Sequence, residues 1–367
     1  MQPAIPNSRA FDARFRCPIS QKPSLIRADC NCLGRGAKRR YPELNEILAT
    51  EADDGLEYDD NRRLDGQCQR LRELIGERER CSPSRVLLGG SGLERIPMIA
   101  AALGIERIIR LEGDFHGYDR HSLLTGVERI TLRVDPKTRT LSPEALAAAV
   151  RGLGKAMLML TLGGSNPLLT PITRAHVKAA HEANPELVIL VDGAYRQYSD
   201  QFHLSDLADE FDRVIYLQVA SKDIFLPGPR LSWVVPSARF AERLTQIQAP
   251  FPLNTGGVRQ AIAMLERPEL LAALRGEQAK ARDILIEGLS RLRLTLISGV
   301  APWVVLQWPG DAAAVVRKLE DDYGVLVQQQ IHAPLEDSWM RISATTPEEA
   351  THIVWAVTLI VVQGIAH

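Results

Sequence analysis

The chain has little net charge and no apolar segment long enough to cross a membrane. Its 44 Lys and Arg side chains nearly balance 45 Asp and Glu, which leaves a net charge of −1. Such a balance gives no general attraction to nucleic acid or to an anionic membrane surface, so we expect neither as a partner. The most apolar segment, residues 353–362, is shorter than the roughly 20 residues of a membrane-spanning helix.

Cysteines are also few. The five, at Cys17, Cys30, Cys32, Cys68 and Cys81, are an odd and scattered set, and the amino terminus lacks the basic start and apolar stretch of a signal peptide. We therefore expect free thiols and a cytoplasmic location. Cys30 and Cys32 could form half of a metal site, but no Cys/His pair at zinc spacing follows them. No metal is expected.

The composition and the order of the elements favour an α/β fold. With 367 residues, of which 45% are hydrophobic and 24% charged, the chain can build a large core. Strand patterns alternate with helical patterns from residue 86 to residue 235, which predicts a mostly parallel, doubly wound sheet. We expect an N-terminal arm at residues 1–50, a large domain at 51–280 and a small α/β C-terminal domain at 281–367.

Two predicted buried strands end in polar side chains. Residues 187–191 are continuously apolar and lead into Asp192, with Tyr195 three positions later, and residues 157–162 lead into a glycine-rich turn with Asn166. Ligands of open α/β sheets bind at the carboxyl ends of the strands, so we expect these side chains to face a site. The alternatives are that Asp192 only caps the next turn, and that Asn166 is a turn residue set by the following proline.

A third predicted strand runs into a turn rich in glycine. Residues 86–88 precede Gly89, Gly90, Ser91 and Gly92, after which a helical pattern begins. The backbone N–H groups at such a helix start can hold a phosphate. The turn is neither a Walker loop nor a dinucleotide fingerprint, because the required Gly-Lys-Ser/Thr and the required glycine spacing are both missing.

Lys222 follows another strand-like run, directly after Ser221 and eight residues before Arg230. In pyridoxal-phosphate enzymes a lysine amine forms a Schiff base with the cofactor, and nearby hydroxyl and guanidinium groups hold its phosphate. Asp192 could then pair with the pyridinium nitrogen and so make the ring an electron sink. Taken alone, Ser-Lys is a common dipeptide, and a solvated loop lysine is the alternative.

Four features follow one another along the chain: the glycine-rich turn, Asn166 before proline, Asp192 with Tyr195, and Ser221-Lys222 with Arg230. In this order they resemble the fold type I pyridoxal-phosphate enzymes of the class I/II aminotransferase family, in its histidinol-phosphate aminotransferase-like subgroup. Residues 340–349 are similar to the family segment Leu-Arg-Ile-Ser-x-x-x-Pro-Glu-Glu, and residues 29–34 are similar to its early Asn-x-Asn-Pro-Leu-Gly, with Cys32 in place of proline. The resemblance implies the fold type I transferase fold, with a large sheet domain and a small C-terminal domain, and pyridoxal 5′-phosphate as the cofactor.

The resemblance also implies a role for individual residues. Lys222 would be the Schiff-base lysine and general acid/base, Asp192 the pyridinium partner, and Asn166 and Tyr195 the donors to the phenolic oxygen. Phe115 matches the aromatic residue on the cofactor ring, although an aromatic side chain there could be plain core. Phosphate would be held by Ser91, Gly92, Ser221, Arg230 and, from the partner subunit, Tyr58; the substrate would be bound by Arg341 and Asn31.

Two departures from the family pattern bear on the substrate and the site. Gly193 stands where an acid usually precedes Ala-Tyr, and Gln328 stands where histidinol-phosphate enzymes have arginine. The missing cation argues against a phosphorylated substrate.

We therefore predict an aminotransferase that moves an amino group between an amino acid and a 2-oxo acid. A decarboxylase or another lyase that cleaves a bond at Cα is an alternative on the same fold, because the same residues support it. A non-catalytic binding or regulatory module is the alternative from another class. Tyr58 and the long arm further predict a homodimer with the site near its interface.

Overall fold

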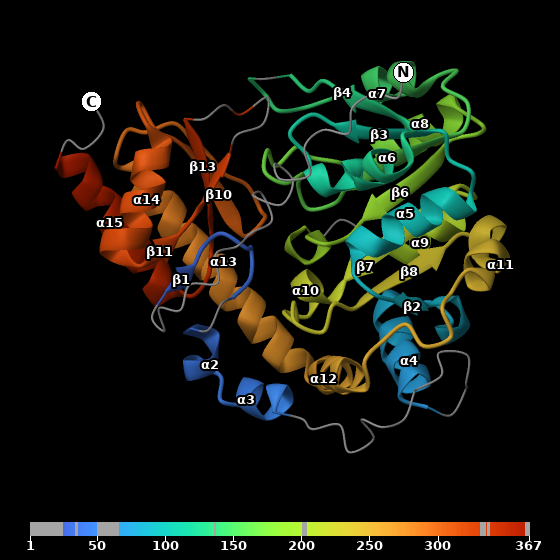
Figure 1. Ribbon diagram of the computed structural model, residues 1–367, viewed down its shortest axis with the longest axis horizontal. Helices are drawn as coiled ribbons and strands as arrows, with labels where there is room; N and C mark the ends of the chain where they lie inside the picture. Colours follow the sequence, from blue (N-terminus) through green and yellow to red (C-terminus); the bar gives the residue numbers. More distant parts are fainter. Residues whose placement is uncertain are drawn as a thin grey trace.

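The computed structural model describes residues 25–33, 36–49, 66–135, 137–199, 204–330, 335 and 338–363. Tyr58 and the first 24 residues of the predicted arm lie outside these ranges. Figure 1 shows two bodies side by side, one built on the middle of the chain and one on its C-terminal part. No helix within the described ranges is long and apolar enough to cross a membrane.

Seven strands of the described chain form the larger sheet, in the order β2-β8-β7-β6-β5-β3-β4. The strands β7, β6, β5, β3 and β4 are parallel, whereas β8 is antiparallel to both of its neighbours. This confirms the mostly parallel sheet predicted from the alternation of strands and helices. The strands are β2 (Leu87–Gly89), β3 (Arg107–Leu111), β4 (Glu128–Leu132), β5 (Ala156–Thr161), β6 (Val188–Asp192), β7 (Val214–Val219) and β8 (Ser232–Pro236).

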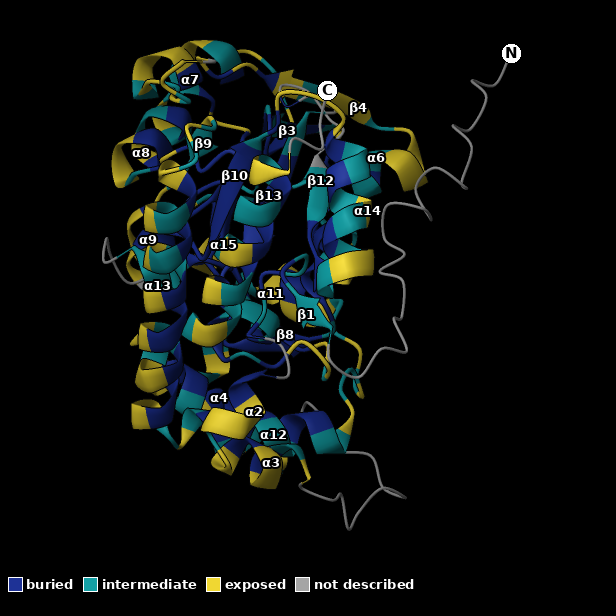
Figure 2. Cartoon of the chain, turned by 90° about the vertical axis from the view of Figure 1, so that its left-hand side faces the viewer, coloured by how far each residue is buried: buried dark blue, intermediate teal, exposed yellow. Residues whose placement is uncertain are grey.

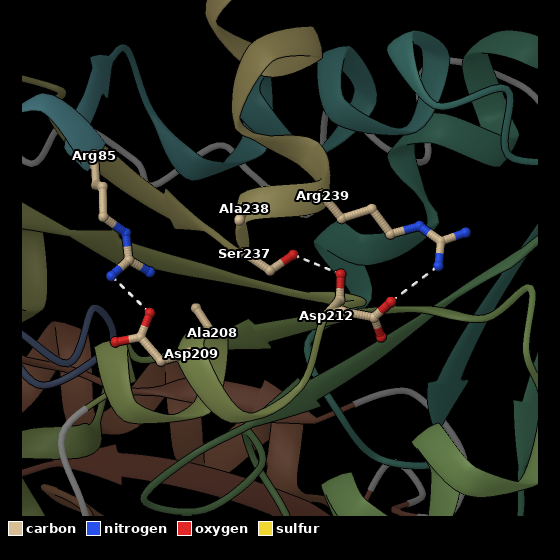
Figure 3. A pocket seen from close by; sticks show the side chains of 7 residues that line it. All are labelled: Arg85, Ala208, Asp209, Asp212, Ser237, Ala238 and Arg239. Atoms are coloured by element: carbon tan, nitrogen blue, oxygen red, sulfur yellow. Dashed lines mark hydrogen bonds and ion pairs between the residues drawn. The ribbon is translucent and has the colours of Figure 1, made fainter.

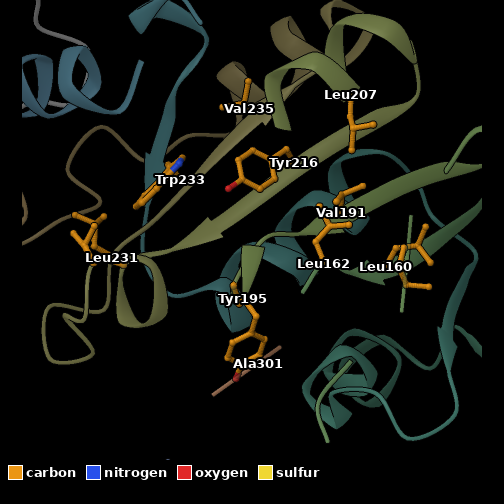
Figure 4. Close-up of a cluster of buried hydrophobic side chains, with 14 of the residues drawn as sticks. Leu160, Leu162, Val191, Tyr195, Leu207, Tyr216, Leu231, Trp233, Val235 and Ala301 are labelled. Carbon is orange, nitrogen blue, oxygen red and sulfur yellow. The ribbon is translucent and has the colours of Figure 1, made fainter. Parts of the chain in front are cut away.

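Both faces of this sheet are covered, which explains its continuously apolar strands. Side chains alternate between the two faces of a strand. In β5, Met157 and Met159 belong to one buried hydrophobic cluster, and Leu158 and Leu160 belong to another. Figure 4 shows part of the second cluster around Tyr216. One face is covered by α5 (Gly92–Ala102) and α11 (Ala238–Gln246), and the other by α4 (Gln67–Glu79), α7 (Pro143–Val150), α8 (Arg174–Ala183), α9 (Leu204–Glu210) and α12 (Thr255–Leu265).

A smaller antiparallel sheet, in the order β12-β13-β10-β9, forms the C-terminal body. Three helices pack on it around a separate hydrophobic cluster, and in Figure 1 the long α13 runs into this body from α12. Figure 2 shows β10 buried, whereas α14 carries exposed positions. The elements are α13 (Pro268–Ser290), β9 (Leu296–Ile297), β10 (Trp303–Gln307), α14 (Ala312–Tyr323), β12 (Gln328–Gln330), β13 (Trp339–Ser343) and α15 (Pro347–Val362).

A short strand from the N-terminal segment joins the C-terminal body. β1 (Ile26–Arg27) pairs in parallel with β11 (Val325–Leu326), and the Ser343 N–H donates to the carbonyl of Ala28. The remaining helices of the described chain are α2 (Gly36–Arg40), α3 (Glu43–Leu48), α6 (Arg120–Thr125), α10 (Ala220–Asp223) and the 3₁₀ helices η1 (Pro83–Arg85), η2 (His116–Asp119) and η3 (Arg196–Tyr198).

The sequence also predicts a strand at residues 326–328 and a helix at residues 312–319, and both bounds differ from the observed ones. The single strand predicted at residues 326–328 is instead the end of β11 and the start of β12, because these two short strands pair with different partners. The helix predicted to end at Leu319 continues to Tyr323, where Gly324 in the left-handed region (φ 67°) ends it. The three predicted domain ranges stay predictions; α13 itself runs across residue 280.

Candidate active site

The predicted site residues that follow β5, β6 and β7 lie at the same edge of the larger sheet. Thr161 at the end of β5 pairs with Asp192 at the end of β6, and Asp192 pairs in turn with Leu217 of β7. Lys222 follows in α10, one turn after β7 ends. The parallel order of these three strands is therefore what brings Asp192 and Lys222 to one edge.

Asp192 is buried, with 8% of its surface exposed, and both carboxylate oxygens are hydrogen-bonded. Oδ1 accepts from the N–H of Ala194 at 2.8 Å, and Oδ2 accepts from the Tyr118 hydroxyl at 2.8 Å. Burial raises the pKa of Asp192, while these two hydrogen bonds act in the opposite direction. Oδ1 thus caps the following turn, as the alternative interpretation of Asp192 predicted. Oδ2 joins β6 to Tyr118 of η2.

The turn after β5, which carries Asn166, approaches Tyr195. Gly163 in that turn has φ 80°, and a Cβ there would lie 2.1 Å from the carbonyl oxygen of Tyr195, so only glycine fits. The Trp303 Nε1–H donates to the Pro167 carbonyl at 3.0 Å, and the Trp303 ring meets the Tyr195 ring edge-on at 4.6 Å. Asn166, in a cis bond to Pro167, accepts from Arg341 Nη1 at 2.6 Å.

The N-terminal segment contacts the turns that follow β6 and β7 and a strand of the smaller sheet. Asn31 Nδ2 donates to the Tyr195 hydroxyl at 2.9 Å, and the Asn31 N–H donates to Ser343 Oγ at 3.0 Å. The Lys222 amine donates to the carbonyls of Cys30 at 2.6 Å and Asn31 at 3.2 Å. Cys32 Sγ lies 3.4 Å from the same nitrogen. Lys222 and Cys30, which are 192 positions apart in the sequence, are therefore in contact.

The predicted phosphate turn lies beside the end of β7. Ser91 precedes the first turn of α5, and its N–H donates to the Glu94 carboxylate at 3.1 Å. A Cβ on Gly92 would lie 3.1 Å from Val219 Cγ1, so the helix start approaches the strand that leads to Lys222. Arg230, by contrast, has an exposed side chain, in a loop where its φ is 58°.

Two ion pairs support the turns that carry Tyr195 and Lys222. Arg196 Nη2 lies 3.0 Å from Glu79 Oε1, and Arg78 Nη2 lies 2.7 Å from Asp223 Oδ1. Glu79 and Asp223 are fully buried. Arg78 and Glu79 end α4, whereas Arg196 directly follows Tyr195 and Asp223 directly follows Lys222. The last turn of α4 is therefore joined to both turns.

Sequence reasoning missed several side chains of this site. Asp114 and Tyr118 flank the predicted Phe115, whose ring meets the Tyr118 ring edge-on at 5.5 Å, and Thr161 ends β5. The strand-end position of Thr161 was a usable signal. The position of Tyr118 was not, because its contact with Asp192 joins residues 74 positions apart.

A cavity of about 310 Å³ lies elsewhere, near the amino end of β7. Figure 3 shows its charged side chains paired with one another, Arg85 with Asp209 at 2.7 Å and Arg239 with Asp212 at 3.0 Å. It faces the edge of the sheet opposite to Lys222. Within the described ranges, no group of three or more His, Cys, Asp or Glu side chains could hold a metal ion.

The amino-acid sequence from residue 37 to residue 357 matches the model of the family described as aminotransferase class I and II. The chain belongs to this family. It is a pyridoxal-phosphate-dependent aminotransferase, which confirms the predicted family, cofactor and enzyme class.

Individual relatives agree with this assignment. Histidinol-phosphate aminotransferase 2 of Carboxydothermus hydrogenoformans is 24% identical over 300 residues, which cover 79% of this chain and 80% of the relative. The crystal structure of histidinol-phosphate aminotransferase from Sinorhizobium meliloti with pyridoxal-5′-phosphate has a TM-score of 0.79 at 21% identity, covering 93% and 92% of the two chains. The crystal structure of L-threonine-O-3-phosphate decarboxylase from Porphyromonas gingivalis has a TM-score of 0.76 at 16% identity, and the match covers 92% of this chain and 99% of that chain. At these identities the structures share the fold alone.

The residues of this aminotransferase fit the cofactor in kind. A primary amine, Lys222, and a buried carboxylate, Asp192, follow neighbouring parallel strands, and the N-terminus of the eleven-residue helix α5 lies against the end of β7. These are the groups that pyridoxal phosphate requires at its aldehyde, its ring nitrogen and its phosphate.

Proposed function

We propose that this aminotransferase acts on an α-amino acid without a phosphate group and on a 2-oxo acid, with Arg341 binding the α-carboxylate and Lys222 carrying the proton. The observation that carries the proposal is the surroundings of Arg341 in β13. Its guanidinium is 5% exposed, yet among the described residues its hydrogen bonds go to neutral oxygens, Asn166 Oδ1 at 2.6 Å and the Asp29 carbonyl at 2.5 Å.

A buried cation of this kind favours an anionic ligand. Nε of Arg341 is buried and has no hydrogen-bond partner in the described chain. Burial lowers the pKa of Arg341, which reflects the poor solvation of the charged form. A substrate carboxylate would supply both the missing charge and the missing acceptor. The sequence alternatively allows an ion pair of Arg341 with Glu348 or Glu349 at the start of α15. The hydrogen bonds of Arg341 go to Asn166 and Asp29 instead, and Glu348 pairs with Arg40.

Lys222 is the residue that we expect to move protons. When bound, the cofactor supplies an electron sink for the charge that develops at the substrate Cα. The Lys222 amine, displaced by the amino substrate, would take the proton from Cα and return it at C4′ of the cofactor. Asp192 would hold a proton on the ring nitrogen, and the carbonyls of Cys30 and Asn31, which now accept from the amine, would position it.

The absence of a phosphate group on the substrate follows from Gln328. In the smaller sheet Gln328 lies directly opposite Arg341, so that the two side chains leave the same face of neighbouring strands. An arginine here would add a second cation beside the carboxylate-binding one and could hold a phosphate. A neutral amide favours instead a substrate whose side chain carries no strong negative charge.

A screen of amino donors tests the proposal. Each amino acid, with and without a phosphorylated side chain, is mixed with the holoenzyme, the change in cofactor absorption is followed, and the product is identified. An oxo acid from an unphosphorylated amino acid is the expected product. Preference for histidinol phosphate would contradict the proposed substrate class, and an amine product would favour the decarboxylase alternative. Cofactor binding without turnover of any donor would favour the non-catalytic module.

We also propose a homodimer in a reducing cytoplasm. Exposed apolar side chains support an interface, for example Phe251 at 45% and Trp355 at 52% exposure. The four cysteines within the described ranges are free thiols, which suits a reducing compartment. Analytical ultracentrifugation, with activity measured across the same concentrations, tests the dimer; a fully active monomer would contradict it.

A further inference from the structure

Asp114, in the turn after β3, is a buried carboxyl group at the centre of the site. It is 4% exposed, and no Lys or Arg within the described ranges forms an ion pair with it. Its Oδ1 accepts from the N–H groups of Phe115 at 2.7 Å and Asn166 at 3.2 Å. Its Oδ2 lies 2.9 Å from the Thr161 hydroxyl. Asp114 therefore holds two residues predicted to contact the cofactor, as well as one hydroxyl.

That hydroxyl begins a chain that reaches the second buried acid. Thr161 Oγ1 lies 2.8 Å from the Tyr118 hydroxyl, which lies 2.8 Å from Asp192 Oδ2. The four groups thus form one line: Asp114, Thr161, Tyr118, Asp192. The titratable groups that face Asp114 are Asp192 from β6 and Tyr118 from η2. Burial raises the pKa of Tyr118 well above its ordinary value, so Tyr118 keeps its proton and is a donor.

The number of protons on these four groups determines the direction of the hydrogen bonds between them. If both acids are ionised, Thr161 donates to Asp114 and Tyr118 donates to Asp192, and no proton remains for the 2.8 Å contact between the two hydroxyl oxygens. One further proton on the line, at either acid, removes the conflict. We consider it on Asp114 Oδ2. Asp114 then donates to Thr161, Thr161 donates to Tyr118, and Tyr118 donates to an ionised Asp192. Oδ1 of Asp114 already accepts from two N–H groups, which leaves Oδ2 as the oxygen for the proton.

We propose that Asp114 is a positioning residue that carries the proton of this buried acid pair, and that it keeps Asp192 ionised through Thr161 and Tyr118. Two neighbouring buried acids seldom both ionise, and such a pair then carries a single proton. Burial raises the pKa of Asp114 to about 6, with the Phe115 N–H and Thr161 acting against the rise. An ionised Asp192 is what a protonated pyridine nitrogen needs as its partner. The role rests on the proposed assignment of Asp192, but the position of the proton does not.

The first measurement needs no cofactor and no substrate. The infrared carbonyl band of a protonated carboxylic acid is recorded for the apoenzyme and for Asp114→Asn, slightly below pH 6, and the spectra are subtracted. A band present in the wild type and lost in the variant is expected. Its absence from the difference spectrum would place the proton elsewhere and overturn the proposal, whatever reaction the enzyme catalyses.

The second measurement asks whether the line acts on the reaction. In Asp114→Asn, the amide oxygen can accept the two N–H bonds and the amide nitrogen can donate to Thr161, as the protonated acid does. Its kcat should therefore stay at least about tenfold above that of Asp114→Ala, which loses these bonds. The kcat of Thr161→Ser should likewise exceed that of Thr161→Val, and the two variants of each pair should have nearly equal KM. Equal kcat within both pairs would overturn the positioning role.

A matched control lies in the same turn. Asp119 is also buried, at 6% exposure, but it pairs with Arg110 at 2.9 Å and Arg129 at 3.2 Å and not with the line of hydroxyls. Asp119→Asn should lower the melting temperature and leave kcat, KM and the infrared difference unchanged. A fall in kcat equal to that of Asp114→Ala would mean that any buried acid in this turn matters alike, and would overturn the specific role of Asp114.

Discussion

Replacing Arg341 by lysine should raise KM for the amino donor and leave cofactor binding unchanged. The guanidinium lies in β13 at the site, with Asn166 and the Asp29 carbonyl as neutral partners. Its planar fork can hold a carboxylate through two parallel, charge-assisted hydrogen bonds, a geometry that a lysine ammonium cannot copy. Lysine keeps the charge, so the comparison isolates the fork.

The size of the effect follows from the number of bonds lost. A hydrogen bond to a charged group contributes about 1.5–3 kcal/mol, and Arg341→Lys removes one of the two. KM should therefore rise roughly 10- to 150-fold, and Arg341→Ala, which removes both bonds and the charge, should raise it further. Where the tilt of the Cα–H bond is disturbed as well, kcat should also fall.

The assay measures kcat, KM and the melting temperature on the same preparation. Arg341→Lys also loses a bond to Asn166 or to Asp29, so a fall of a few degrees is expected, since about 1 kcal/mol shifts Tm by roughly 2–4 °C in larger domains. Arg110→Lys is the matched control, because Arg110 is a half-buried arginine paired with Asp119 and lies outside the site. An unaltered KM with a lower melting temperature would remove Arg341 from substrate binding.

Three further predictions concern Lys222, Asp192 and the buried acid Glu79. Lys222→Ala should abolish the yellow colour and the turnover, and an active, normally coloured variant would refute the assignment of Lys222. Asp192→Ala should retain cofactor through the phosphate contacts but lose most of its kcat, because an unprotonated ring is a poorer electron sink; an unchanged kcat would contradict that role. Burial raises the pKa of Glu79 from 4.5 to about 7. Between these two values the folded state holds a proton that the unfolded state has released. The free energy of unfolding should therefore fall as pH rises through this interval. Urea unfolding across the interval should show a smaller fall for Glu79→Gln, and equal slopes for the two proteins would refute the shift.

The end of β6 was predictable from the sequence because its buried apolar run stops at a polar residue. Asp192 ends β6 where the apolar run stops. The run is continuously apolar rather than alternating, which indicated a sheet buried on both faces. What followed the strands was harder to predict. Asp114 had no visible partner in the sequence, since its contacts with Thr161 and Asn166 span 47 and 52 positions. Such contacts depend on the order of strands in the sheet, which local patterns do not encode.

The contacts of the N-terminal segment could not be predicted for the same reason. A motif at residues 29–34 suggested that Asn31 binds substrate, but nothing in it indicated the bonds from Asn31 to Tyr195 and Ser343, which join three distant parts of the chain. Cys32, considered from the sequence as a departure from proline and as half of a metal site, places its sulfur 3.4 Å from the Lys222 amine.

Asn166 shows how this site keeps Asp114 and Arg341 apart. Its N–H donates to Asp114 and its side-chain oxygen accepts from Arg341, so a neutral residue stands between a buried acid and a buried cation. An acid in direct contact with Arg341 would ionise and pair with that cation. Separation leaves Arg341 able to bind a carboxylate from outside and leaves Asp114 to order the hydroxyls that lead to Asp192. Local arrangements that disfavour stability are expected where the chain serves a ligand, and here the contacts of Asp114 and Arg341 meet at one asparagine.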